Sequence, residues 1–121
     1  MLDETRLIPT QPAFITLFGA NTPERMWYLA NHDVPEGFWR NDFRQENIST
    51  GANGLSLAIT RKAERSARPW NGSEITTHEK YGYGRYEVVM SPARGSGLIS
   101  SFFTFTGPYF GDQHDEIDIE F

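Results

Sequence analysis

The chain has 121 residues, a formal net charge of −5 and 38% hydrophobic residues. The length suits one small domain, and the acidic balance argues against a nucleic-acid partner, because surfaces that bind nucleic acid are basic. The chain has no cysteine, which excludes disulfides and thiolate metal sites. No apolar run approaches the roughly 20 residues of a membrane-spanning helix, so we expect no membrane partner.

The first part of the chain contains many prolines and few periodic patterns. We expect residues 1–53 to be an irregular N-terminal segment with early strands, and residues 54–121 to be the strand-rich part of the same domain. The N-terminal residues lack the basic and apolar segments of a secretory signal. Either such a signal does not exist, or it was removed before residue 1.

The first clear strand pattern is GLSLAITR, residues 54–61, which follows a turn at Gly54. Apolar and polar residues alternate here, and this alternation predicts a half-buried strand with Leu55, Leu57 and Ile59 facing inward.

Further strand patterns follow at steady spacing. The pair Asn71-Gly72 predicts a hairpin turn, with a short strand over residues 74–78 behind it. Two more strands are expected over residues 85–90 and 98–106, where Gly and Pro end each run. No stretch of helical length shows a 3.6-residue period.

The last strand, DEIDIEF, alternates acidic and apolar residues. Side chains two apart on a strand share a face, so Glu116, Asp118 and Glu120 are expected on one face. The apolar face, Ile117, Ile119 and Phe121, would then pack against a second sheet. The acidic face carries no Lys or Arg, so its carboxylates repel one another.

Three interpretations of the acidic face are open. The first is an ordinary solvated strand face. The second is a calcium site, which we consider a poor fit because calcium ligands usually converge from a loop around the ion. The third is glycoside hydrolysis, which uses two carboxyl groups about 5–5.5 Å apart in retaining enzymes. Residues four apart lie about 13 Å apart on a flat strand, so this chemistry requires a curved one.

Short strands separated by Gly and Pro turns predict an all-β chain, a β-sandwich or β-jelly roll. Five or six strands are fewer than a sandwich with a ligand groove usually has. We therefore expect about half of a full fold. The last strand would leave an open sheet edge, suited to self-association or to a complementing C-terminal half.

The motif EIDIE resembles the active-site motif of glycoside hydrolase family 16, and residues 81–121 resemble the core of its lichenase-like bacterial endo-β-glucanases. The resemblance implies a β-jelly roll with a concave sugar-binding sheet. It implies Glu116 as nucleophile, Asp118 as assisting acid and Glu120 as general acid/base of a retaining mechanism.

The resemblance also implies substrate-binding residues. Glu74 lies in GSEITT, which is similar to a substrate-binding strand of the family. His114 comes just before the motif, where lichenases commonly carry Trp, and Thr76 stands where they often carry Arg. These two differences leave linkage specificity open. Phe103 and Trp39 are candidates for stacking on sugar rings, although large aromatic residues more often fill a core.

The implied substrate is a β-linked glucan or a related bacterial exopolysaccharide. No cofactor is required, although lichenase-like relatives often bind a structural calcium ion away from the catalytic strand. By the same resemblance the protein is extracellular or periplasmic. Two other functions remain open: a non-catalytic β-glucan-binding module, and an assembly fragment that needs a complementing half. The choice between hydrolase and transglycosylase is also open, and the isolated chain is expected to have little activity.

Overall fold

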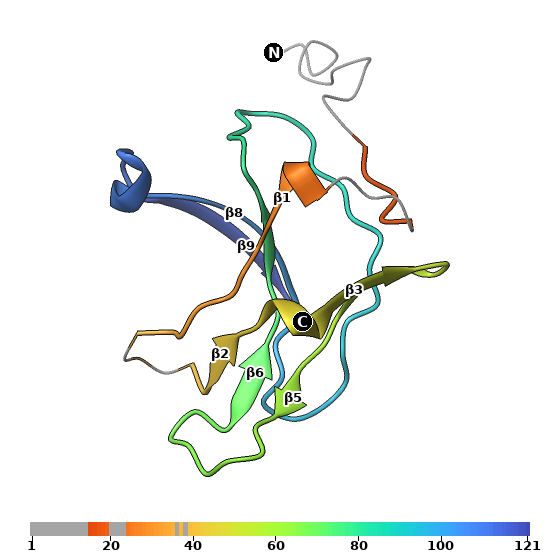
Figure 1. Ribbon diagram of the computed structural model, residues 1–121. Coiled ribbons are helices and arrows are strands. Elements are labelled where there is room, and N and C mark those ends of the chain that lie inside the picture. The colour runs from red at the N-terminus through yellow and green to blue at the C-terminus, as the bar shows by residue number, and fades with distance from the viewer. Residues whose placement is uncertain (1–14, 20–23, 36, 38) are drawn as a thin grey trace. The chain divides into compact units, whose positions relative to one another are not determined.

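The computed structural model describes residues 15–19, 24–35, 37 and 39–121. Residues 1–14, 20–23, 36 and 38 of the N-terminal segment expected to be irregular therefore lie outside the described residues, and the described remainder contains three strands. The chain divides into two compact units, Met1–Tyr83 and Gly84–Phe121. The described parts of both contain strands and short 3-10 helices (Figure 1). None of their helices is long and apolar enough to cross a membrane.

The first unit contains seven strands and two 3-10 helices among its described residues. In chain order they are η2 (Glu24–Met26), β1 (Trp27–Leu29), β2 (Asn41–Phe43), η3 (Gln45–Asn47), β3 (Ile48–Gly51), β4 (Gly54–Leu57), β5 (Thr60–Arg61), β6 (Trp70–Gly72) and β7 (Ile75–Thr77). They form an antiparallel pair β1-β7, a three-stranded sheet in the order β2-β6-β5, and a hairpin β3-β4.

The second unit contains one long antiparallel hairpin. Its elements are β8 (Ser101–Thr106), η4 (Pro108–Phe110) and β9 (Asp115–Glu120). In Figure 1 the two strands run side by side and end in a compact connecting loop. Both strands lie where the sequence predicts them, because each is long, alternates in polarity and is bounded by Gly, Pro or polar residues.

The segment 54–61 differs from the expected single strand. It forms β4, which pairs with β3, and β5, which pairs with β6. The turn at Gly54 is present, with a φ of 96° that favours glycine. The inward placement of two residues is wrong, because Leu57 is 47% exposed and Ile59 is 42% exposed. The chain changes its pairing partner between β4 and β5, so one inward face does not continue along the segment.

The expected hairpin turn at Asn71-Gly72 is also wrong. Both residues lie in β6, which pairs in parallel with β2 and places Gly72 opposite Phe43. A Cβ added at Gly72 would come within 2.6 Å of the Asn41 side-chain nitrogen. The glycine therefore serves the close approach of two strands rather than a turn.

The strand expected over residues 85–90 is not formed, and this segment has no regular secondary structure. The sequence has the right alternation, but an extended segment becomes a strand only when a neighbour hydrogen-bonds to its backbone. The sheets among the described residues do not include it. Instead, several of its side chains line an apolar groove beside the β8-β9 hairpin.

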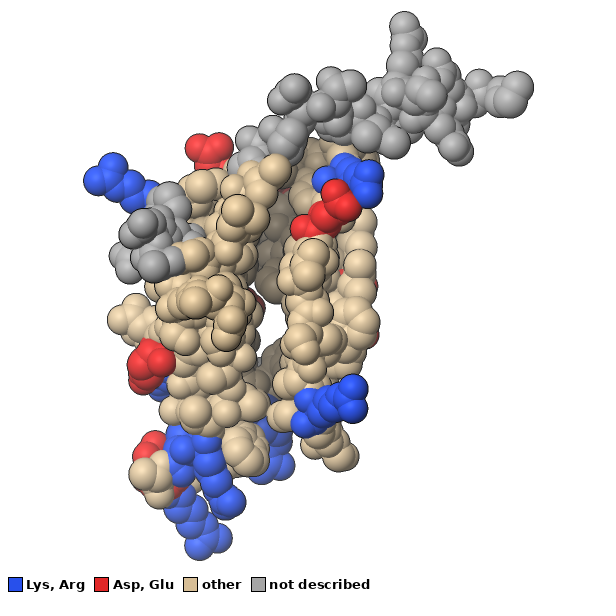
Figure 2. Space-filling model, turned by 90° about the vertical axis from the view of Figure 1, so that its right-hand side faces the viewer, with Lys and Arg blue, Asp and Glu red and all other residues tan. Residues whose placement is uncertain are grey.

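Few side chains are fully buried in the described part of the chain. Ala30 is its one buried hydrophobic residue, and Asp42 is its one buried charged residue. Many large apolar side chains are exposed instead, among them Ile117, Ile119 and Phe121. Figure 2 shows a face that is mostly uncharged, with Lys, Arg, Asp and Glu in scattered groups. Packing of apolar side chains therefore contributes less to this chain than to an ordinary domain of its length.

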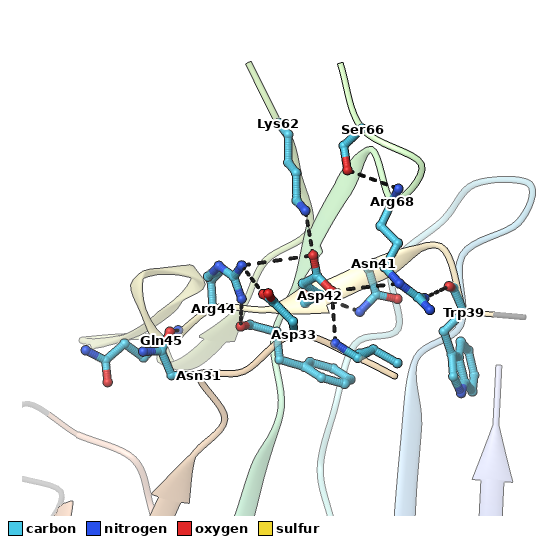
Figure 3. Close-up of polar contacts among 12 residues, drawn as sticks. Asn31, Asp33, Trp39, Asn41, Asp42, Arg44, Gln45, Lys62, Ser66 and Arg68 are labelled. Carbon is cyan, nitrogen blue, oxygen red and sulfur yellow. Dashed lines mark hydrogen bonds and ion pairs between the residues drawn. The ribbon is translucent and has the colours of Figure 1, made fainter. Parts of the chain in front are cut away.

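Asp42 is the centre of an ionic cluster in the first unit (Figure 3). Lys62 Nζ donates to its Oδ2 at 2.5 Å, and the Val34 backbone N–H donates to its Oδ1 at 2.9 Å. Arg44 and Arg68 each lie 4.0 Å from the carboxylate. The cluster thereby connects β2 with the segments before and after it.

The two arginines extend this cluster to neighbouring loops. Arg44 Nη2 donates to Asp33 Oδ1 at 2.5 Å. Arg68 donates to the backbone carbonyl of Pro35 at 2.5 Å and to that of Trp39. The hydrogen bond from Lys62 lowers the pKa of Asp42, and burial opposes this shift without outweighing it.

Candidate active site

The acidic strand β9 pairs along its whole length with β8. Glu116 lies opposite Phe105, Asp118 opposite Phe103 and Glu120 opposite Ser101. Residues directly opposite in an antiparallel pair point to the same side of the sheet. The acidic face of the hairpin therefore combines three carboxylates with two aromatic rings and a hydroxyl.

The hydrogen-bond pattern places these pairs at the closest positions of the ladder. Ser100 and Phe121 exchange both backbone hydrogen bonds, at 3.1 and 2.9 Å. Hydrogen-bonded and non-hydrogen-bonded pairs alternate along an antiparallel ladder. The three acids therefore belong to non-hydrogen-bonded pairs, in which opposite side chains are nearest. Phe103 lies across from Asp118, the middle acid.

The apolar face of β9 does not pack against a second sheet, contrary to the expectation from sequence. Ile117 is 66% exposed, Ile119 is 51% exposed and Phe121 is 59% exposed. Within the second unit, this face borders a groove of about 440 Å³. Its lining is Tyr86, Glu87, Val88, Met90, Phe102, Ile119 and Phe121. Within the second unit, no further strand is present to cover this face.

His114 lies at the start of the acidic face, two residues before Glu116. Its Nε2 is 3.1 Å from Glu116 Oε2. Its ring also meets the Phe105 ring edge-on, with centroids 5.6 Å apart and planes at 81°. The structure thus places this predicted substrate-binding residue directly against the predicted nucleophile.

Glu74, which precedes β7 in the first unit, has a different environment. Its backbone carbonyl accepts a hydrogen bond from Ala30 N–H at 3.0 Å. Burial raises the pKa of its carboxyl group, and the charge of His32 opposes this rise. His32 is in turn 3.5 Å from the Tyr28 hydroxyl through its Nδ1.

Sequence patterns did not single out His32 as a neighbour of Glu74. The two residues are brought together by the pairing of β1 with β7, which joins segments more than 40 residues apart in the chain. No spacing within the sequence indicates that His32 and Glu74 are neighbours. Only knowledge that β1 pairs with β7 would have predicted it.

The remaining predicted residue is Trp39, which also belongs to the first unit. It is 42% exposed, and its backbone carbonyl accepts a hydrogen bond from Arg68. Glu74 and Trp39 thus lie in the first unit, whereas His114, Phe103 and the three acids lie in the second. Among the described residues, no group of three or more His, Asp or Glu side chains gathers as a metal site, so no calcium ligands are assigned.

The chain is similar to known β-glucanases. The chain is 45% identical over 108 residues to a β-glucanase from Paenibacillus polymyxa, covering 88% of this chain and 42% of that protein. It is 45% identical over 96 residues to a β-glucanase from Bacillus subtilis, covering 78% of this chain and 38% of the relative. The chain therefore spans about two fifths of the curated relatives it matches.

Solved structures give the same result for the fold. A Bacillus licheniformis β-glucanase matches with a TM-score of 0.79 and 34% identity, covering 93% of this chain and 51% of that one. A lichenase from a mouse hindgut metagenome matches with a TM-score of 0.75 and 41% identity, covering 82% and 46%. The expected all-β fold, about half of a β-jelly roll, is confirmed.

A family model places the match on the part of the chain that holds the acidic strand. The model for glycosyl hydrolases family 16 covers residues 38–121, which includes the whole β8-β9 hairpin and most of the first unit's strands. The chain belongs to glycosyl hydrolases family 16.

Proposed function

We propose that this chain is the part of a retaining endo-β-glucanase that carries its catalytic carboxylates. The observation that supports this most is the acidic face of β9. Glu116, Asp118 and Glu120 share one face opposite Phe105, Phe103 and Ser101. The substrate would be a β-linked glucan, in keeping with the β-glucanases to which the chain is similar. Linkage specificity is left open by the sequence differences at Thr76 and His114.

The division of labour is the one that the resemblance to the family's active-site motif implies, and retaining hydrolysis uses two such carboxyl groups. In the first step Glu116 attacks the anomeric carbon while Glu120 protonates the departing glycosidic oxygen. In the second, Glu120 removes a proton from water, which attacks the glycosyl-enzyme and releases Glu116. Asp118 lies between them on the same face of β9 and is the assisting acid in this proposal. Phe103, opposite Asp118, offers a flat apolar ring to the sugar.

Glu74 and Trp39 are proposed to bind substrate. Glu74 is half-buried, and its raised pKa marks a carboxyl group poorly solvated by water. Such a group gains by accepting hydrogen bonds from sugar hydroxyls. Trp39 offers an exposed ring. By family membership the protein would be extracellular or periplasmic.

Chemical rescue tests the catalytic assignment. In the chain combined with its complementing C-terminal half, Glu116→Ala and Glu120→Ala should each lose turnover of an aryl β-glucoside oligosaccharide, and azide should restore it. With Glu116→Ala, azide attacks the substrate directly and gives the α-glycosyl azide. With Glu120→Ala, azide attacks the glycosyl-enzyme and gives the β-glycosyl azide. Proton NMR distinguishes the products, and Asp115→Ala is the matched control. If both variants give the same anomer, the assignment is wrong.

A second candidate function is assembly through β9, and the exposure of that strand favours it. β9 pairs with β8 alone among the described strands. Because hydrogen-bonded pairs alternate along the ladder, the backbone groups of Glu116, Asp118 and Glu120 point to its outer edge. An unpaired edge of this kind accepts a further strand. We propose that a complementing C-terminal half or a second copy supplies it. Sedimentation of the chain with and without a separately made C-terminal half distinguishes the two.

A further inference from the structure

The feature that carries a further inference is the contact between His114 and Glu116. His114 Nε2 lies 3.1 Å from Glu116 Oε2, a distance suited to a charge-assisted hydrogen bond. The side chain of Glu116 is 36% exposed and that of His114 is 64% exposed. An exposed pair of this kind adds little to folding stability, so its effect is to be sought in what it does to the carboxylate.

The loop that delivers His114 is held by its own hydrogen bonds. Phe110 N–H donates to Gly107 O at 2.8 Å, and Gly111 N–H donates to Pro108 O at 3.0 Å. Thr106 Oγ1 lies 2.7 Å from Asp112 Oδ2, which closes the loop onto the end of β8. Gly111 has a φ of 79°, in the left-handed region that glycine adopts without strain. These hydrogen bonds and the β9 ladder hold the chain at Asp112 and from Asp115 onward, on either side of His114.

Two aromatic rings restrain the imidazole further. The Phe105 ring, opposite Glu116 across the ladder, meets the His114 ring edge-on. Phe110, in the same loop, packs edge-on against Phe105 with centroids 6.2 Å apart. The His114 ring is thus held between the Phe105 ring on β8 and the Glu116 carboxylate on β9.

When a hydrogen bond holds one oxygen of a carboxylate, the other oxygen remains available to the substrate. Imidazole carries a hydrogen on Nε2 both as the imidazolium and as the neutral Nε2–H tautomer, so His114 donates to Oε2 in either form. Oε1 then faces away from the donor. A nucleophile held in one orientation reaches the anomeric carbon without a search over its rotamers.

We propose that His114 is a positioning residue for Glu116, a role that rests on the proposed retaining mechanism. The His114 hydrogen bond fixes Oε2 and leaves Oε1 as the attacking atom. This differs from the role expected from sequence, in which His114 binds the sugar itself. The two roles separate in kinetics, because positioning changes kcat whereas sugar binding changes KM.

The contact can be tested without turnover, on the chain as it is. With ¹⁵N-labelled histidine, the Nε2 resonance of His114 is compared in the native chain, in Glu116→Ala and in Glu120→Ala. The chain has three histidines, so His32 and His78 serve as internal controls. We expect His114 Nε2 to move in Glu116→Ala and to stay in place in Glu120→Ala. An unmoved resonance in Glu116→Ala, or equal movement in both variants, would overturn the proposal.

The kinetic test uses two replacements of His114 in the chain combined with its complementing half. His114→Phe keeps a flat ring and removes the donor, whereas His114→Gln keeps an N–H donor. We expect His114→Phe to lower kcat by up to about 100-fold with KM nearly unchanged, and His114→Gln to recover part of the loss. A raised KM with unchanged kcat would overturn positioning in favour of sugar binding.

The choice of leaving group separates this role from acid catalysis. A dinitrophenyl glycoside needs no protonation on departure, so Glu120→Gln should lose little in its first step, whereas the His114→Phe defect should persist. Relief of the His114→Phe defect by this substrate would overturn the assignment. Absence of turnover together with a His114 Nε2 resonance that moves in Glu116→Ala would count against the proposed hydrolase, although the contact itself would be present. Turnover together with a His114 Nε2 resonance that does not move in Glu116→Ala would overturn the positioning role but leave the proposed hydrolase in place.

Discussion

At the scale of single residues, Asp42 and Glu74 show how similar carboxyl groups acquire opposite properties. Asp42 is buried but accepts hydrogen bonds from Lys62 and Val34, which lowers its pKa. Glu74 is half-buried, and burial raises its pKa. Stabilisation of the charged form by donors exceeds the cost of burial at Asp42, while the cost of burial prevails at Glu74. The first arrangement suits a structural role and the second suits a binding role.

The Asp42 cluster predicts a large stability effect for one substitution. Asp42→Asn removes the charge that Lys62, Arg44 and Arg68 share, and leaves Lys62 with a side chain only 10% exposed. Breaking a buried ion pair from one side costs about 3–5 kcal/mol. Urea unfolding followed by tryptophan fluorescence measures the change. Asp33→Asn is the control, because Asp33 is 78% exposed and should cost at most about 1 kcal/mol. Equal losses of unfolding free energy in Asp42→Asn and Asp33→Asn would show that the burial of Asp42 does not matter.

The same cluster predicts how stability depends on acidity. The pKa of Asp42 is lowered in the folded state from an ordinary value of 3.8. The stability it contributes is therefore fully present above the unfolded pKa and is lost as pH falls through the folded pKa. The native chain should lose more stability than Asp42→Asn as the pH falls below about 3.8. Urea midpoints at several acidic pH values test this, and parallel pH profiles would contradict it.

Glu74 predicts the reverse dependence. Its pKa is raised in the folded state above an ordinary value of 4.5. The neutral form is favoured by folding, so stability is fully present below the unfolded pKa and is lost as pH rises through the folded pKa. Glu74→Gln should therefore raise the unfolding midpoint at pH 7 and leave it nearly unchanged at pH 4. Glu79→Gln, at an exposed position, is the control. A stabilisation equal at both pH values would rule out this cause.

At the scale of elements, local sequence predicts a strand well when its partner is close in the chain. The β8-β9 hairpin and the turn at Gly54 follow from alternation and from turn residues, and both are present. Asn71-Gly72 also carries a turn signal, but its position is decided by the parallel pairing of β6 with β2. That pairing joins segments about 30 residues apart, and no window of the sequence contains both.

The candidate site was predictable to the same extent. Alternation alone places the three acids on one face, and the structure confirms that they share it with Phe103 and Phe105. The contact of His114 with Glu116 depends on the path of the connecting loop, and the Asp42 cluster depends on residues from four separate segments. Such contacts are set by tertiary structure rather than by spacing. The strand expected over residues 85–90 is absent for the same reason, because alternation of polarity does not predict whether a partner strand is present.

The pairing of β2 with β6 makes a prediction of its own. Gly72→Ala would bring a Cβ within 2.6 Å of Asn41 Nδ2, and relieving this contact should cost about 1–3 kcal/mol. Gly51→Ala is the matched control, because nothing lies within 4 Å of its added Cβ. Combining Gly72→Ala with Asn41→Ala should recover most of the loss in a double-mutant cycle. Additive losses would show that Asn41 is not the obstacle.

At the scale of the whole molecule, the chain exposes much of the apolar surface that an ordinary domain buries. Ala30 is the single buried hydrophobic residue among those described, and the apolar face of β9 is exposed. The chain also spans only about two fifths of its curated relatives. Both observations favour a molecule that gains stability when a further layer is added to it.

We therefore expect a complementing C-terminal half to stabilise the chain and to give it activity. Mixing the chain with the part of the Paenibacillus polymyxa β-glucanase that follows the matched region should raise the thermal midpoint and produce β-glucan hydrolysis. The chain alone should show little activity. Ile117→Thr combined with Ile119→Thr should weaken the complementation, because these residues are exposed on the face to be covered. Val89→Thr, which is fully exposed elsewhere, is the control. Full activity from a chain shown to be monomeric would contradict the expectation.

The outer edge of β9 also affects the solubility of the chain. Its outward-facing backbone groups belong to Glu116, Asp118 and Glu120, so a strand that pairs there from another molecule must approach three acidic side chains. Charged side chains at sheet edges are a common protection against growth of β-fibrils. Neutral replacements of these acids, made to stop catalysis, would remove that protection at the same time. Such variants should form thioflavin-binding aggregates sooner than the native chain, even though their strands are unchanged.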